Sequence, residues 1–108
     1  MGLDQYATAV KGEDKIELKY WRKHANLNGW MERLWKAKGN SVEFNCEDLE
    51  LTKQDLLALR AELYHLPTAT GFFWGTSQPY QDKDTEEFVE RALELINKGY
   101  TILYSCWW

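Results

Sequence analysis

The sequence predicts an α+β or small α/β fold, with a single domain over residues 1–108 and a mixed β-sheet of about five strands with three helices. Three observations predict this fold. Apolar residues alternate with polar ones in several short segments, they recur at helical spacing in three longer segments, and turn-forming residues separate the two kinds. The predicted order is ββαβαβαβ, and neither an internal repeat nor a linker divides the chain.

The N-terminal segments QYATAV (5–10) and KIELKYW (15–21) both alternate, and the KGED between them has turn chemistry. They predict a β-hairpin whose second strand places Ile16, Leu18 and Tyr20 on one face.

The next segment, NLNGWMERLWKAKG (26–39), predicts a helix. Asn26 or Asn28 can cap its start, and Gly39 can close its end in the left-handed conformation. Its apolar stripe comprises Leu27, Trp30, Met31, Leu34 and Trp35.

The middle of the chain predicts a strand, a loop and a second helix. VEFNCEDLEL (42–51) opens with alternating apolar residues, which indicates a strand followed by a loop. Thr52 with Asp55 resembles a capping box for a helix over KQDLLALRAELYHL (53–66), and Pro67 ends that helix.

The remaining elements are a strand, a helix and a strand. GFFWG (71–75) is a short apolar run between glycines, which predicts a buried strand, and the polar stretch 76–84 predicts the longest loop. A third helix then runs to Gly99. YTILYSCWW (100–108) alternates as a strand that sends Trp107 and Trp108 to opposite faces, and its two apolar faces predict a central strand covered on both sides.

Composition and charge exclude several classes of function. Hydrophobic residues at 44% and charged residues at 28% are ordinary for a globular domain. The net charge of −4 argues against general nucleic-acid binding, although residues 1–38 hold eight Lys and Arg against five Asp and Glu. No run is long and apolar enough for a membrane span, and MGLDQY does not open like a secretory signal, so we expect a cytoplasmic protein with no membrane partner.

The residues for catalysis and metal binding are sparse. His24 and His65 are isolated in the sequence, and Cys46 and Cys106 lie in predicted strands, where thiols are usually inert. The chain contains neither HExxH, CxxC nor a glycine-rich phosphate loop. We therefore expect no cofactor, no metal and no catalytic residues.

The junction KYWRKHANLNGW (19–30) is the best candidate for a binding site, because it combines cationic donors, amides and rings beside a helix N-terminus. Nucleotide-like anions use such groups. The expected ligand-binding residues are Trp21, Arg22, Lys23 and His24, with Trp74, Trp107 and Trp108 as platforms for stacking. The alternative interpretation is structural, with the tryptophans in the core, the cations solvated and the asparagines as caps.

Several segments together resemble a family of small proteins of tailed bacteriophages, whose members are often labelled phosphoglycerate kinase. They are the start MGLDQYA, the junction YWRKHANLNGWMERLW, the middle FNCEDLELTKQDL and LPTATGFFWGTS, and the finish GYTILYSCWW. Because the chain has no glycine-rich nucleotide loop, we do not carry over a kinase activity. The resemblance implies a bacterial cytoplasm during infection and supplies no catalytic residues.

Three functions follow from these observations. The first is non-catalytic binding of an anionic, nucleotide-like small molecule, such as a nucleotide-derived immune signal of the host, by a protein that assembles as a homo-oligomer. The second is inhibition of a host defence enzyme through exposed aromatic residues. A small enzyme of undefined reaction ranks third.

Overall fold

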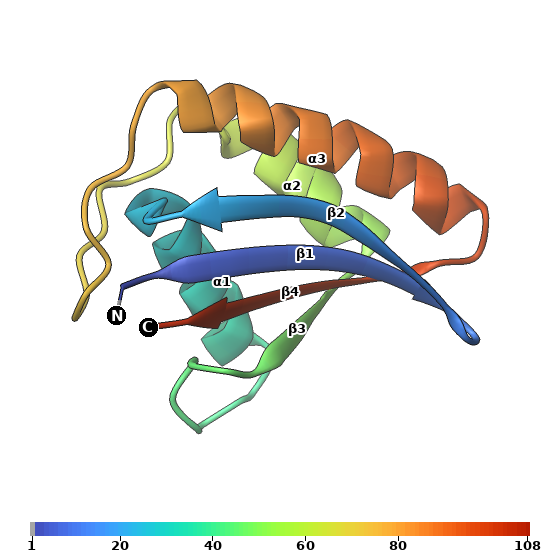
Figure 1. Cartoon of the computed structure of the whole chain (residues 1–108), viewed down its shortest axis with the longest axis horizontal. Helices are drawn as coiled ribbons and strands as arrows, with labels where there is room; N and C mark the ends of the chain where they lie inside the picture. The colour runs from blue at the N-terminus through green and yellow to red at the C-terminus, as the bar shows by residue number, and fades with distance from the viewer. Residues whose placement is uncertain (1) are drawn as a thin grey trace.

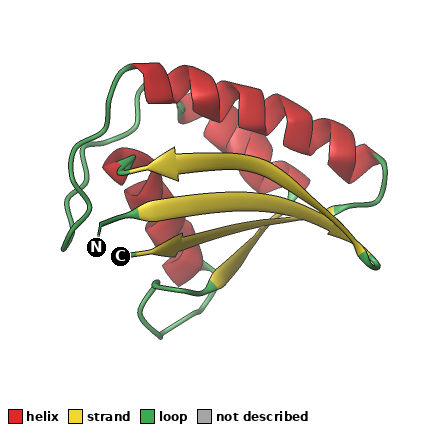
Figure 2. Ribbon diagram, in the orientation of Figure 1, coloured by secondary structure: helices red, strands yellow, loops and turns green. Residues whose placement is uncertain are grey.

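A computed structural model describes residues 2–108 and shows one α+β domain with four strands and three helices (Figures 1 and 2). The elements are β1 (Asp4–Lys11), β2 (Asp14–Arg22), α1 (Ala25–Ala37), β3 (Asp48–Leu51), α2 (Lys53–Glu62), α3 (Tyr80–Asn97) and β4 (Thr101–Trp107). The strands form one sheet in the order β2-β1-β4-β3, with every neighbouring pair antiparallel. The predicted mixed sheet of about five strands is therefore wrong in strand number and direction, and the order is ββαβααβ.

The helices pack on one face of the sheet, and the core lies between them. In Figure 1 α1 and α2 lie behind the strands, while α3 runs along the top beside β2. Ala7 and Ala9 of β1 are fully buried at the centre of the sheet, where their small side chains leave room for large rings. The rings that fill this space are Trp21, Trp35, Phe44, Phe88 and Tyr104, with centroids of neighbouring rings 5.2–6.1 Å apart.

The predicted strand at 71–75 is wrong, because this segment is a turn. Trp74 donates its backbone N–H to the carbonyl of Gly71 at 3.1 Å, and Phe73 and Gly75 have positive φ angles of 66° and 75°. Trp74 is buried, whereas Phe72 is 71% exposed. A short apolar run between glycines has the same pattern whether it is a strand or a turn that buries a single ring.

Three other predicted boundaries also change. The strand predicted at the start of 42–51 is wrong, because Cys46 lies exposed in a loop with a φ of +61°, and strand β3, Asp48–Leu51, occupies the part predicted as a loop. Helix α2 ends at Glu62, before Pro67, and α3 begins at Tyr80, inside the predicted loop. The capping box of Thr52 and Asp55 is confirmed.

The final strand is interior, as predicted, but only one of its faces is covered. Strand β4 pairs with β1 on one side and with β3 on the other. Ile102, Tyr104 and Cys106 are buried under the helices, whereas Trp107 on the opposite face is 64% exposed. Antiparallel sheets commonly leave one face open in this way.

A β-bulge changes the faces of β2. The register shifts between Ala7 and Thr8, so that Ile16 lies opposite the buried Ala9 while Tyr20 lies opposite Tyr6. Ile16 and Tyr20 therefore occupy opposite faces, against the prediction from strict alternation, because a bulge inserts one residue into the period of two.

Candidate functional site

The seven residues expected at a binding site differ in their exposure to solvent. Trp21, His24 and Trp74 are buried, Arg22, Lys23 and Trp107 are exposed, and Trp108 is half-buried. Within the junction at 19–30, Trp21 and His24 are therefore structural residues, as the alternative interpretation had it.

Trp21 and Trp74 offer no open ring face to a ligand. Trp21 packs edge-on against Phe88 and donates its indole N–H to the hydroxyl of Thr85 at 3.1 Å. Trp74 packs edge-on against Trp108, with ring centroids 6.0 Å apart. Both rings act as core residues, and Trp74 also backs the ring of Trp108.

A cavity of about 230 Å³ lies at the end of the sheet, lined by Gly2, Asp4, Trp107 and Trp108. We call it the tryptophan cavity. Two cationic side chains lie close to Gly2. A Cβ atom built at this position would be 2.9 Å from the Arg22 guanidinium and 3.0 Å from the Lys23 Cε atom. Arg22 and Lys23 thus lie beside Gly2, which lines the cavity together with Trp107 and Trp108, although Lys23 and Trp107 are 84 positions apart in the sequence.

Hydrogen bonds hold Trp108 in place at one wall of the cavity, whereas Trp107 at the other wall is exposed to solvent. Trp108 donates its indole N–H to the carbonyl of Phe44 at 3.0 Å. The side-chain amide of Asn45 accepts from the Trp108 backbone N–H at 3.0 Å and donates to its carbonyl at 2.9 Å. Trp107 leaves most of its ring in contact with solvent, so a planar group can stack on it.

The charges around this cavity are partly balanced. Asp4 accepts hydrogen bonds from the hydroxyl of Tyr20 and from Arg22, the latter at 2.7 Å, and both lower the pKa of its carboxyl group. Asp4 therefore offsets the charge of Arg22. Among residues 2–108, no ion pair within 4.0 Å engages Lys23, which leaves it as the uncompensated cation at this end.

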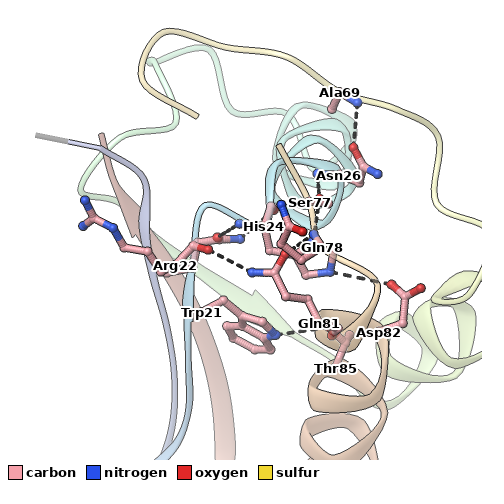
Figure 3. Close-up of polar contacts among 11 residues, drawn as sticks. Trp21, Arg22, His24, Asn26, Ala69, Ser77, Gln78, Gln81, Asp82 and Thr85 are labelled. Atoms are coloured by element: carbon pink, nitrogen blue, oxygen red, sulfur yellow. Dashed lines mark hydrogen bonds and ion pairs between the residues drawn. The ribbon is translucent and has the colours of Figure 1, made fainter. Parts of the chain in front are cut away.

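His24 lies instead in a polar cluster with the partly exposed Ser77 and Asp82 at the N-termini of α1 and α3 (Figure 3). Its Nδ1 atom is 2.7 Å from the hydroxyl oxygen of Ser77, and its Nε2 atom is 3.9 Å from Asp82 Oδ1. Ser77 Oγ also accepts the backbone N–H of Asn26 at 2.9 Å, so its hydroxyl connects the His24 ring to the start of α1. Burial lowers the pKa of His24 to about 4, so the ring is neutral at pH 7.

The residues of this cluster are the ones used in nucleophilic catalysis, but the geometry serves helix capping. The 3.9 Å separation is too long for a hydrogen bond between His24 and Asp82. Ser77 supplies the capping oxygen for α1, whose N-cap residue makes no side-chain cap. The predicted caps at Asn26 and Asn28 are wrong, since Asn26 instead accepts the backbone N–H of Ala69 and Asn28 is buried within the helix.

Gln5 fixes the junction that leads into α1. Its side-chain oxygen accepts the His24 backbone N–H at 2.8 Å, and its amide nitrogen donates to the His24 carbonyl at 3.0 Å. Sequence analysis missed Gln5, Ser77 and Asp82, because each lies far along the chain from His24 and no local pattern marks it.

Neither thiol nor metal chemistry gains support from the geometry. Burial raises the pKa of the Cys106 thiol to about 12, which keeps it protonated at neutral pH. Within residues 2–108, no group of three or more His, Cys, Asp or Glu side chains lies close enough to hold a metal ion. No helix in this range is long and apolar enough to cross a membrane.

Comparison of the chain with protein-family models, with curated proteins and with solved structures gave no match. The function is therefore argued from the geometry.

Proposed function

We propose that the protein acts by non-catalytic binding of a planar anionic ligand in the tryptophan cavity. The observation that carries this proposal is that Trp107 and Trp108 line a cavity with Gly2, and that Arg22 and Lys23 lie beside this glycine. An exposed indole supplies a face for a nucleobase, and the Lys23 ammonium and Arg22 guanidinium supply charge-assisted donors for phosphate.

The size of the cavity limits what enters it. A volume of about 230 Å³ is below the roughly 300–1,000 Å³ typical of pockets that enclose a drug-sized ligand. A single base or ribose fits inside, while the phosphates extend toward Arg22 and Lys23. A nucleotide-derived immune signal of a bacterial host, the ligand class suggested by the resemblance to phage proteins, contains both parts.

Titration calorimetry with cyclic dinucleotides and adenosine diphosphate ribose derivatives tests this proposal, at about 100 μM protein to suit micromolar dissociation constants. We expect saturable binding that Trp107→Ala weakens by about tenfold, because the variant removes a stacking face worth roughly 1–3 kcal/mol. Tyr80→Ala is the matched control, since Tyr80 is 66% exposed and does not line the cavity. Absence of heat with every ligand would contradict the proposal.

Recovery of the ligand separates binding from turnover. After heat denaturation of the complex, mass spectrometry should return the intact ligand. A converted product would instead make the protein an enzyme, because only turnover alters the ligand.

A second candidate function, inhibition of a host defence enzyme, is favoured by the aromatic residues on the open face of the sheet. Tyr6, Tyr20 and Trp107 are 40%, 51% and 64% exposed on this face. Aromatic residues of this kind dominate the energetics of protein interfaces. A pull-down from host lysate should return one stoichiometric partner that Tyr20→Ala releases, whereas a chain that retrieves only itself would be a homo-oligomer.

A further inference from the structure

The β-bulge between β1 and β2 opens a second cavity on the uncovered face of the sheet. Ala7 pairs with Lys19 and Thr8 with Glu17, so Leu18 has no partner across the strands. A cavity of about 410 Å³ lies at this point, within the usual range for ligand pockets. We call it the bulge cavity, and it is lined by Tyr6, Ala7, Thr8, Glu17, Leu18, Lys19 and Tyr20.

Two tyrosine rings form its aromatic wall. Tyr6 and Tyr20 face each other across the strands, with ring centroids 5.4 Å apart and ring planes tilted by 49°. The hydroxyl of Tyr20 donates to Asp4, which in turn is held by Arg22 at 2.7 Å. This chain of contacts fixes the Tyr20 ring before any ligand arrives, which lowers the entropic cost of binding.

The uncompensated charge at the bulge cavity is negative. Glu17 pairs with Thr8 on the open face, and among residues 2–108 no ion pair within 4.0 Å engages its carboxylate. Lys19 pairs with the buried Ala7, and its ammonium group is bound by Glu87 of α3 at 3.2 Å. Its charge is therefore already balanced. Lys15, the next residue of β2 after Glu17 on the open face, pairs with Val10 and is a competing cation.

We propose that the bulge cavity binds the guanidinium group of an arginine side chain presented by a partner protein. The faces of aromatic rings carry partial negative charge and attract cations, and a carboxylate pairs with guanidinium through two parallel hydrogen bonds. Arginine suits this site better than lysine because its planar group stacks on a tyrosine ring while its edge reaches a carboxylate. The site is separate from the tryptophan cavity, and its test requires no anionic ligand.

The test uses two tripeptides that differ only in charge, acetyl-Gly-Arg-Gly-amide and acetyl-Gly-citrulline-Gly-amide. Citrulline has nearly the shape of arginine and no charge. Both peptides are titrated into the whole protein and followed by the NMR shifts of the backbone amides and tyrosine rings. We expect saturable shifts at Tyr6, Glu17 and Tyr20 with the arginine peptide, with a dissociation constant on the order of 1 mM and about tenfold weaker binding of the citrulline peptide.

Charge variants identify the site. Glu17→Gln should weaken arginine binding by about tenfold, because it removes the charge-assisted pair. Glu13→Gln removes the same charge from the exposed hairpin turn and should leave binding unchanged. Lys15→Gln should strengthen binding about twofold by removing the competing cation.

Three results would overturn the inference. Equal binding of the two peptides would show that the cavity takes neutral groups. Shifts confined to residues outside the cavity would place the cation elsewhere, and absence of saturation by about 20 mM peptide would exclude binding in the expected range.

Discussion

His24 stays neutral inside the protein because its surroundings suit the uncharged ring. The side chain is 1% exposed, and Asp82, the one carboxylate within 4.0 Å of it among residues 2–108, lies beyond hydrogen-bond distance. Burial also raises the pKa of Asp82, so neither member of the pair gains a strong ionic contact. At the scale of single residues, this histidine makes stability depend on pH.

The first prediction concerns this pH dependence. An unfolded histidine titrates near pH 6.5, whereas burial lowers the pKa of His24 in the folded protein to about 4. Below about pH 6.5 the unfolded chain therefore binds a proton at His24 that the folded protein does not bind. As the pH falls from 6.5 to 4, this difference should lower the free energy of unfolding by about 3 kcal/mol. Urea unfolding of the protein and of His24→Gln over this range measures the effect.

His24→Gln should lose that decrease, because glutamine does not titrate. The comparison variant is His65→Gln, which removes the other histidine at an exposed position. If both variants follow the unmodified protein across the range, the environment assigned to His24 is wrong.

At the scale of elements, α1 depends on a residue from a distant loop. Its N-cap residue supplies no side-chain oxygen, and Ser77, 51 positions after Asn26, accepts the Asn26 N–H instead. The 76–79 segment thus holds the start of α1 and leads directly into α3. Propensity along the chain cannot reveal a cap of this kind, because capping patterns are read from adjacent residues.

The second prediction is that Ser77→Ala destabilises the protein by about 2 kcal/mol, because it leaves both the Asn26 N–H and His24 Nδ1 without their partner. Equilibrium unfolding in urea measures the loss. Ser41→Ala removes the same hydroxyl at an exposed loop position and should change the free energy of unfolding little. Equal effects of the two substitutions would exclude the capping role of Ser77.

At the scale of the whole molecule, one buried polar network connects the sheet to α1. Tyr104 of β4 accepts a hydrogen bond from Gln5 of β1 at 2.9 Å and donates one to Asn28 of α1 at 2.7 Å. The phenol is fully buried, and burial raises its pKa well above the ordinary value, which keeps it protonated and able to donate. This network links the middle of α1 to two strands of the sheet.

The third prediction is that Tyr104→Phe lowers the free energy of unfolding by about 2 kcal/mol, since Asn28 Oδ1 loses its donor in a site closed to water. Urea unfolding should show this loss with an unchanged dependence on denaturant. Tyr100→Phe is the control, because the Tyr100 hydroxyl makes no hydrogen bond within residues 2–108. A larger loss for Tyr100→Phe would contradict the role of the network.

The α+β class, the N-terminal hairpin, three helices and an interior last strand could all be predicted from the sequence, because local periodicity specifies such elements. Of the seven residues that the sequence placed in one candidate site, Trp107 and Trp108 line a cavity, Arg22 and Lys23 lie beside Gly2 at its edge, and Trp21, His24 and Trp74 are buried elsewhere.

Only the tertiary structure decided which rings are core and which are open. The bulge at Ala7 and Thr8 reverses the faces of part of β2, and the turn at 71–75 buries Trp74 while exposing Phe72. An apolar side chain has the same place in a sequence pattern whether it packs under a helix or faces solvent. That outcome depends on contacts between residues distant in the chain, and those contacts form only when the sheet and helices come together.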